Sequence, residues 1–189
     1  MTAAPRVGLR VTADGDERLS AIYQRVMKSV DGVPAMYQAL GNSPEILDAW
    51  IGLGWGLRSS STADRGLLEL AILRVAQLTG SDYVWRSHWG AARKAGVGEE
   101  KLRALHRWPD EQAFTEPEVA VLALTDALTS DITVPDRIWS AVADRFDDRQ
   151  RVELVMTIAW YCCVARVATG LAVPPDEHHA RVPGLHESS

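Results

Sequence analysis

Cysteine is scarce in this sequence, because its 189 residues contain only Cys162 and Cys163, two neighbours in an apolar stretch. Side chains at consecutive positions of a helix point about 100° apart, so adjacent cysteines are poorly placed to act as a redox pair. We interpret both as small core residues. The sequence therefore predicts no thiol chemistry from them.

Long apolar runs are also missing. Residues 1–16 contain no apolar run of signal-peptide length. No stretch approaches the roughly 20 apolar residues that a membrane-spanning helix needs. We therefore expect a soluble, cytoplasmic protein without a membrane partner.

Charge of one sign is not concentrated anywhere in the chain. The 25 acidic and 20 basic residues give a net charge of −5 and are mixed along the sequence. Without a basic face, a nucleic-acid partner is not expected, and a small neutral or anionic ligand is the better match. Convincing strands and a Gly-rich phosphate loop are lacking too, so nucleotide binding is not expected. We interpret Gly52, Gly54 and Gly56 as a helix end or irregular turn.

What the sequence does contain is helical periodicity in one domain. With 47% hydrophobic residues the chain can bury one substantial core. Residues 1–16 and 174–189 lack an apolar period and are interpreted as an N-terminal arm and a C-terminal tail around a helical domain, 17–173. Apolar residues recurring at i, i+3, i+4 and i+7 predict helices at 17–30, 44–56, 63–79, 82–95, 98–107, 116–129, 135–146 and 148–169. The predicted fold class is therefore all-α.

Several helix ends have a chemical signature. Thr115 and Glu118 form a capping box at the start of one helix. Gly80 and Gly96 stand where helices end in a left-handed residue, and Ser81 offers the next helix an N-cap. These signals predict a pair of consecutive helices joined by a short link.

Two polar side chains are expected to meet inside that helix pair. His88 shares a helix face with Trp85 and several alanines, so it points inward. Glu69 and Arg74 are charges in the otherwise apolar preceding helix, where burial is costly unless the charge is paired or functional. The short link would bring Glu69 within hydrogen-bond or one-water reach of His88. Burial raises a carboxyl pKa and a carboxylate favours imidazolium, which would place both groups near neutrality as an acid–base pair. An inward histidine is also typical of a satisfied core residue.

The segment from Glu69 to Gly96 resembles the carboxymuconolactone decarboxylase / alkylhydroperoxidase D-like superfamily. The likeness rests on the order Glu, Tyr-x-Trp, His and an alanine-rich helix ending in Gly, and a second match runs from Glu153 to Arg166. Together they cover roughly residues 40 to 173. The resemblance implies a single-domain helical bundle of the alkylhydroperoxidase D-like type that assembles into a homo-oligomer, a trimer or hexamer.

The peroxidase branch of this superfamily uses a Cys-x-x-Cys-x-x-x-His motif with a Glu nineteen residues before the His. His88 and Glu69 match that spacing, but Ser81 and Val84 occupy the cysteine positions. A thiolate is the species that attacks a peroxide, and neither side chain provides one. Thiol peroxidase activity at this site is therefore not expected.

The decarboxylase branch also lacks the cysteine pair, and its resemblance implies a cofactor-free acid–base reaction on a small cyclic or aromatic-derived carboxylic acid. His88 would donate the proton and Glu69 would set its tautomer. Arg74 or Arg166 would hold the substrate carboxylate, although a structural ion pair is the alternative for each. A degenerate, non-catalytic member that binds a ligand or partner is the alternative for the whole protein.

The sequence also contains tryptophans that could bind a ligand and a short cluster of possible metal ligands. Five tryptophans are candidates either for a pocket that holds a flat ring or for core packing, namely Trp50, Trp55, Trp85, Trp89 and Trp160. Only Trp85, with the nearby Tyr83, is assigned to substrate binding. The residues Asp176 to His179 resemble a metal-ligand cluster in composition alone, so we interpret them as a solvated tail and expect no metal and no cofactor.

Overall fold

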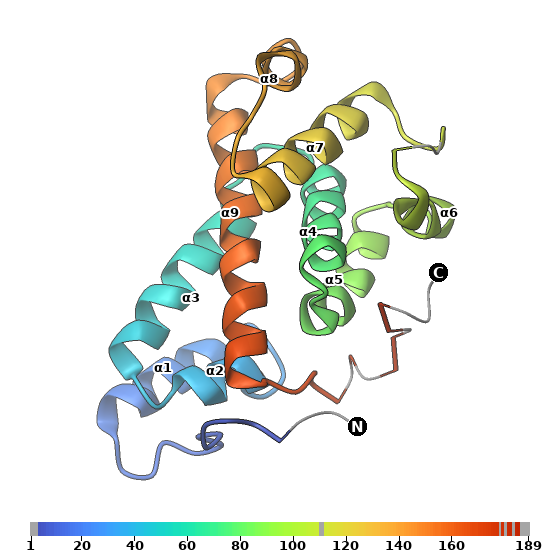
Figure 1. The fold of residues 1–189 in the computed structure, drawn as a ribbon. Helices are drawn as coiled ribbons and strands as arrows, with labels where there is room; N and C mark the ends of the chain where they lie inside the picture. The colour runs from blue at the N-terminus through green and yellow to red at the C-terminus, as the bar shows by residue number, and fades with distance from the viewer. Residues whose placement is uncertain (1–3, 110–111, 178, 180, 183, 186–189) are drawn as a thin grey trace.

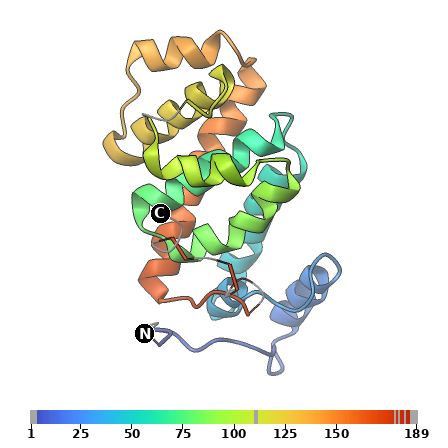
Figure 2. The same cartoon turned by 90° about the vertical axis from the view of Figure 1, so that its right-hand side faces the viewer.

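Two long helices, α4 (Arg65–Thr79) and α9 (Asp148–Leu171), run through the middle of the molecule and pack against each other (Figure 1). The computed structural model describes residues 4–109, 112–177, 179, 181–182 and 184–185. The remaining α-helices are α1 (Glu17–Met27), α2 (Ala35–Leu40), α3 (Pro44–Ser59), α5 (Asp82–Lys94), α6 (Glu99–Ala104), α7 (Glu116–Asp126) and α8 (Asp136–Ala143). Helices α7 and α8 lie at one end of the molecule, and α1 and α2 lie at the other (Figure 2). The described residues contain no strand, and the predicted single-domain, all-α fold is confirmed.

The predicted helices are all present, and one further helix was missed. Helix α2 has six residues, too few to show a helical period in the sequence, and it begins directly after Pro34. The interpretation of Gly54 and its neighbouring glycines as a helix end is wrong, because α3 continues through them to Ser59. A Cβ atom on Gly54 would lie 3.3 Å from the Trp160 ring, so this glycine allows α9 to approach α3 closely.

The link between α4 and α5 has the predicted caps. Gly80 ends α4 in the left-handed region at φ +65°, and the Ser81 side chain accepts the amide of Val84 at the start of α5. Gly96 after α5 has φ +90°. The capping box of α7 is also present, with the Thr115 amide donating to the Glu118 carboxylate at 2.7 Å. These local signals fix α4 and α5 as neighbours, which positions the candidate site.

Helix α4 is buried on nearly every side, because α5, α7 and α9 all pack against it. Helix α9 is long and apolar enough to cross a membrane by length and composition alone, contrary to the expectation that no stretch comes close. One such helix is weak evidence for a membrane span, since the central helix of a water-soluble bundle has the same composition. The contacts of α9 with α3, α4 and α5 fit such a central helix.

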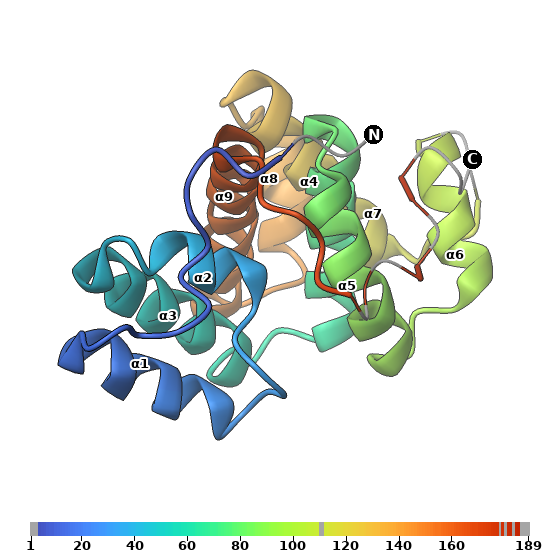
Figure 3. The ribbon, with the colours of Figure 1, turned by 90° about the horizontal axis from the view of Figure 1, so that it is seen from below.

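The described residues before α1 and after α9 run along the helices (Figure 3). The Arg6 amide donates to the last turn of α9 at 2.9 Å. In the C-terminal segment, the Asp176 carboxylate accepts the Ala35 amide at 2.7 Å, and the Leu185 amide donates to the Asp82 carboxylate at 3.0 Å. The expectation of a solvated segment from Asp176 to His179 is therefore wrong for Asp176, whose carboxylate bonds to α2, whereas Glu177 is exposed as expected.

The two cysteines are free thiols on α9. Cys162 is half-buried and Cys163 is exposed, so the expectation that both are core residues is wrong for Cys163. Consecutive helical positions point in different directions, and only one of the two can turn toward the interior.

Candidate functional site

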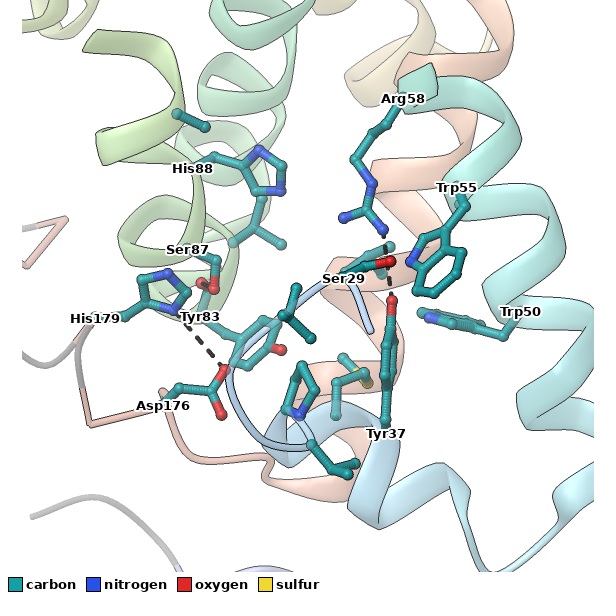
Figure 4. A pocket seen from close by; sticks show the side chains of 18 of the residues that line it. Ser29, Tyr37, Trp50, Trp55, Arg58, Tyr83, Ser87, His88, Asp176 and His179 are labelled. Atoms are coloured by element: carbon teal, nitrogen blue, oxygen red, sulfur yellow. Dashed lines mark hydrogen bonds and ion pairs between the residues drawn. The ribbon is translucent and has the colours of Figure 1, made fainter. Parts of the chain in front are cut away.

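A cavity of about 1370 Å³ opens between α2, α3, α5 and α9 (Figure 4). Helix α5 contributes His88, α3 contributes Arg58, and α9 contributes Tyr161. Residues from both ends of the chain, among them Val11 and Asp176, complete its walls. Its mixture of aromatic side chains and a few polar groups is typical of a small-molecule site.

The candidate acid–base pair lies at this cavity. The His88 Nδ1 atom is 2.8 Å from a Glu69 carboxylate oxygen, so the expected contact is present. Glu69 is fully buried and accepts a second hydrogen bond from Arg65, while His88 lines the cavity. Helix α4 therefore supplies the buried carboxylate and α5 supplies the ring that a ligand can reach.

The pKa of Glu69 lies below its ordinary value. Burial is the largest influence and raises this pKa, but the attraction and hydrogen bonds of His88 and Arg65 together outweigh it. The expectation of a near-neutral pKa for Glu69 is therefore wrong, because His88 and Arg65 both favour the carboxylate over the protonated form. Glu69 is a carboxylate at neutral pH, and a carboxylate can only accept hydrogen bonds. The Nδ1 atom of His88 must then carry a proton.

Aromatic and apolar side chains surround His88 on its cavity side. The Tyr161 ring stands edge-on to the imidazole, with ring centroids 4.6 Å apart at an angle of 81°. Tyr83 lines the cavity as expected, and burial raises the pKa of its hydroxyl, which therefore stays protonated. Of the two positions that hold cysteine in the peroxidase branch, Val84 is part of the cavity wall and Ser81 is a buried helix cap.

Trp85 lies away from the cavity, in contrast to its assignment as a substrate-binding residue. Its side chain is fully buried, between Trp89 at a ring distance of 5.1 Å and His106 at 5.4 Å. The inward face of α5 is divided: His88 faces the cavity, and Trp85 faces the packed core. Helical spacing predicts that both point inward but does not separate these surroundings.

The two arginines expected to hold a substrate carboxylate also lie elsewhere. Arg74 bonds to both carboxylate oxygens of Asp126, at 2.6 and 3.2 Å, which agrees with the structural ion-pair alternative. Arg166 is exposed on α9 and donates to the Cys162 carbonyl oxygen at 2.8 Å. Neither arginine lines the cavity. Each of them instead bonds to a polar group of the protein outside it.

Among the polar residues of the cavity that sequence reasoning missed are Arg58 and Tyr37. Arg58 follows Trp55 by one helical turn on α3, and this i,i+3 spacing was the available signal. Tyr37 lies on the short helix that was not predicted. Three of the candidate tryptophans do line the cavity, and they are Trp50, Trp55 and Trp160.

The C-terminal residues Asp176 and His179 line the cavity on the side of Tyr83 (Figure 4). Their carboxylate oxygen and Nδ1 atom are 3.8 Å apart. His178, another member of the cluster considered in the sequence, lies outside the described residues. Within the described part of the chain, no group of three His, Cys, Asp or Glu side chains is arranged to hold a metal ion.

Comparisons with known proteins agree with this architecture. Residues 44–127 match the carboxymuconolactone decarboxylase family. The uncharacterized protein YdfG of Bacillus subtilis (strain 168) is 32% identical over 100 residues, which are 52% of this chain and 68% of YdfG.

Two solved structures resemble the whole chain. An uncharacterized peroxidase-related protein from Ralstonia eutropha JMP134, with an alkylhydroperoxidase AhpD core, has a TM-score of 0.81 and 13% identity over 95% of this chain and 96% of its own. A variant of the debrominase Bmp8 in complex with 2,3,4-tribromopyrrole has a TM-score of 0.79 and 15% identity over 98% of this chain and 100% of its own. At these identities the likeness establishes the fold alone.

Proposed function

The chain belongs to the carboxymuconolactone decarboxylase family, and from the geometry of its cavity we propose that it is a cofactor-free acid–base enzyme acting on a small cyclic or aromatic-derived carboxylic acid. The observation that carries the proposal is the Glu69–His88 pair, with a buried carboxylate 2.8 Å from a ring that lines a ligand-sized cavity. Family membership supports the coarser statement that the protein acts on small molecules.

In this proposal His88 moves one proton per reaction. Glu69 holds the proton on Nδ1, which leaves Nε2 as the atom that takes a proton from the substrate or returns one to it. When Nε2 is protonated, the ring becomes a cation, and the carboxylate 2.8 Å away stabilises that charge. In a decarboxylation, the electron pair of the broken C–C bond stays on the substrate carbon, and the imidazolium delivers its proton there as CO2 leaves.

Tribromopyrrole in the debrominase Bmp8 complex is a small, flat ring held by a protein of the same fold. This complex supports a ligand of that shape here, because the cavity of the present chain has indole rings in its walls. Val84 in the cavity wall favours the second candidate, a non-catalytic protein that binds such a ligand, since no thiol or acid is present at that position.

A proton-exchange experiment tests the proposal. The protein is incubated in D2O with a panel of small lactone and ring-cleavage acids, and NMR follows deuterium incorporation and loss of CO2. Loss of a general acid–base residue costs about 10²–10⁴-fold in rate. We therefore expect the rates of deuterium exchange and CO2 loss to fall by that factor in the His88→Gln variant. His106→Gln is the matched control, because His106 packs on Trp85 in the core. Binding of an acid without exchange or decarboxylation would favour the non-catalytic candidate.

We also propose that the protein is a water-soluble, cytoplasmic homo-oligomer. Helix α9 exposes Val152 at 62% and Met156 at 37%, one turn apart, which is apolar surface that a second copy can cover. Light scattering coupled to size-exclusion chromatography without detergent measures solubility and molar mass, and a monomeric mass would contradict the assembly.

A further inference from the structure

Arg58 is a cavity cation that forms no ion pair with a described carboxylate, and the Glu69 carboxylate, whose charge acts on it from farther away, is already bonded to Arg65 and His88. The Arg58 Nη2 atom lies 3.5 Å from the Tyr37 hydroxyl, and no described Asp or Glu is within ion-pairing distance. The other arginine in the cavity wall, Arg65, already binds Glu69. A guanidinium offers a planar set of N–H donors that matches a carboxylate, so Arg58 is available to an anionic ligand.

Flat side chains line the cavity next to this cation. The rings of Trp50 and Trp160 have centroids 4.3 Å apart, and Trp55 stands beside the Arg58 guanidinium (Figure 4). Gly54 lies directly beneath the Trp160 ring, since a Cβ there would approach that ring to 3.3 Å. Indole faces favour flat, unsaturated rings over puckered ones, so this side of the cavity selects for planar ligands.

The two sides of the cavity carry charges of opposite sign. Arg58 lies close enough to Tyr161 that its charge opposes, without overcoming, the burial that raises the pKa of the Tyr161 hydroxyl. Tyr161 in turn contacts the His88 ring. Asp176 lies on the opposite side, near Tyr83. Burial raises the pKa of the Tyr83 hydroxyl, and the negative charge of Asp176 raises it further. An anionic group is therefore attracted to the Arg58 side and repelled from the Asp176 side.

We propose that Arg58 and Tyr37, with the indoles of Trp50, Trp55 and Trp160, form a subsite that binds the carboxylate of a planar, unsaturated or aromatic acid. The carboxylate accepts hydrogen bonds from Arg58, the ring lies against the indoles, and the rest of the molecule extends toward His88. This inference rests on the proposed function and names the residues that select its substrate.

Calorimetric titration with two probes of equal shape tests the subsite. 2-Naphthoate carries the carboxylate, and 2-naphthamide has the same planar ring without the charge. A charged hydrogen bond to Arg58 predicts that the wild-type protein binds naphthoate about tenfold or more tightly than naphthamide. Cyclohexanecarboxylate, which has the charge on a puckered ring, should bind more weakly than naphthoate.

Substitution of the arginine separates the subsite from general charge effects. In the Arg58→Gln variant, 2-naphthoate and 2-naphthamide should have similar dissociation constants. Arg58→Lys should keep part of the preference for 2-naphthoate. Arg166→Gln is the matched control, because it removes the same charge from an exposed position outside the cavity. Circular dichroism of each variant checks that it is folded.

Three results would overturn the subsite: equal binding of both naphthyl probes to the wild type, a preference that survives in Arg58→Gln, or no saturable binding of naphthoate up to about 5 mM. The proposed function fails separately. If binding depends on Arg58 but no proton exchange occurs, the subsite is retained and the proposed enzyme activity is rejected. If turnover depends on His88 but is unchanged in Arg58→Gln, the enzyme activity is retained and the subsite is rejected.

Discussion

Replacing Glu69 by glutamine should destabilise the fold, because it removes a buried charge that pairs with Arg65 and accepts a hydrogen bond from His88. Glu69 is fully buried and bonds to both His88 and Arg65. Removing one member of a buried ion pair costs about 3–5 kcal/mol. The Arg65 side chain is 37% exposed and regains water, and glutamine keeps one oxygen for His88, so we discount this to about 2–3 kcal/mol. For a chain of this size the melting temperature would fall by about 4–12 °C.

Urea and thermal unfolding at pH 7, followed by circular dichroism, measure this loss. Glu99→Gln is the control, since it breaks the exposed pair with Arg103 and should cost about 0.5 kcal/mol or less. Folding lowers the pKa of Glu69, so its contribution is complete above the ordinary value of 4.5 and is lost as pH falls through the lower folded value. The difference between Glu69→Gln and wild type should therefore shrink in acid. A variant as stable as wild type at pH 7, or a difference that persists in acid, would refute the reasoning.

Two further predictions concern the cavity walls. Burial raises the pKa of Tyr83 and Tyr161, so their protonated hydroxyls stabilise the fold fully below the unfolded value of 10.0, and this contribution is lost as pH rises above it. Urea midpoints should fall above pH 10 and fall less after Phe substitution; a pH-independent midpoint would contradict this. Gly54→Val should cost about 1–3 kcal/mol by displacing Trp160, whereas Gly52→Ala, in open space on the same helix, should stabilise by about 0.5–1 kcal/mol. Equal melting temperatures for the two glycine variants would show that α3 and α9 are not closely packed there.

The part of the site that could be predicted from the sequence depends on local signals. Gly80 and Ser81 mark the end of one helix and the start of the next, and helical periodicity turns Glu69 and His88 toward the same interior. Because the link is short, the contact between them follows from neighbouring helices alone. The fold class follows in the same way, from periodicity and caps that agree along the chain.

The rest depends on contacts between distant segments, which periodicity does not report. An inward position predicts burial for both Trp85 and Trp160, but only the arrangement of α2, α3 and α9 decides which one meets a cavity. The influence of Arg65 on the pKa of Glu69 was missed for a different reason. Its i,i+4 spacing was visible, but the depth of Glu69, which strengthens the pair, is a property of the packed structure.

The cavity walls combine residues from the segment that matches the family with residues from outside it. Glu69 and His88 lie within residues 44–127, the segment that matches the family, whereas Tyr37, Trp160 and Asp176 line the cavity from outside it. The Glu69–His88 pair thus lies in the shared segment, as does Arg58, whereas much of the remaining cavity wall belongs to the flanking segments. A substitution in those flanks can therefore reshape the cavity without touching the Glu69–His88 pair, so the shape of the site and its polar centre can vary separately in this fold.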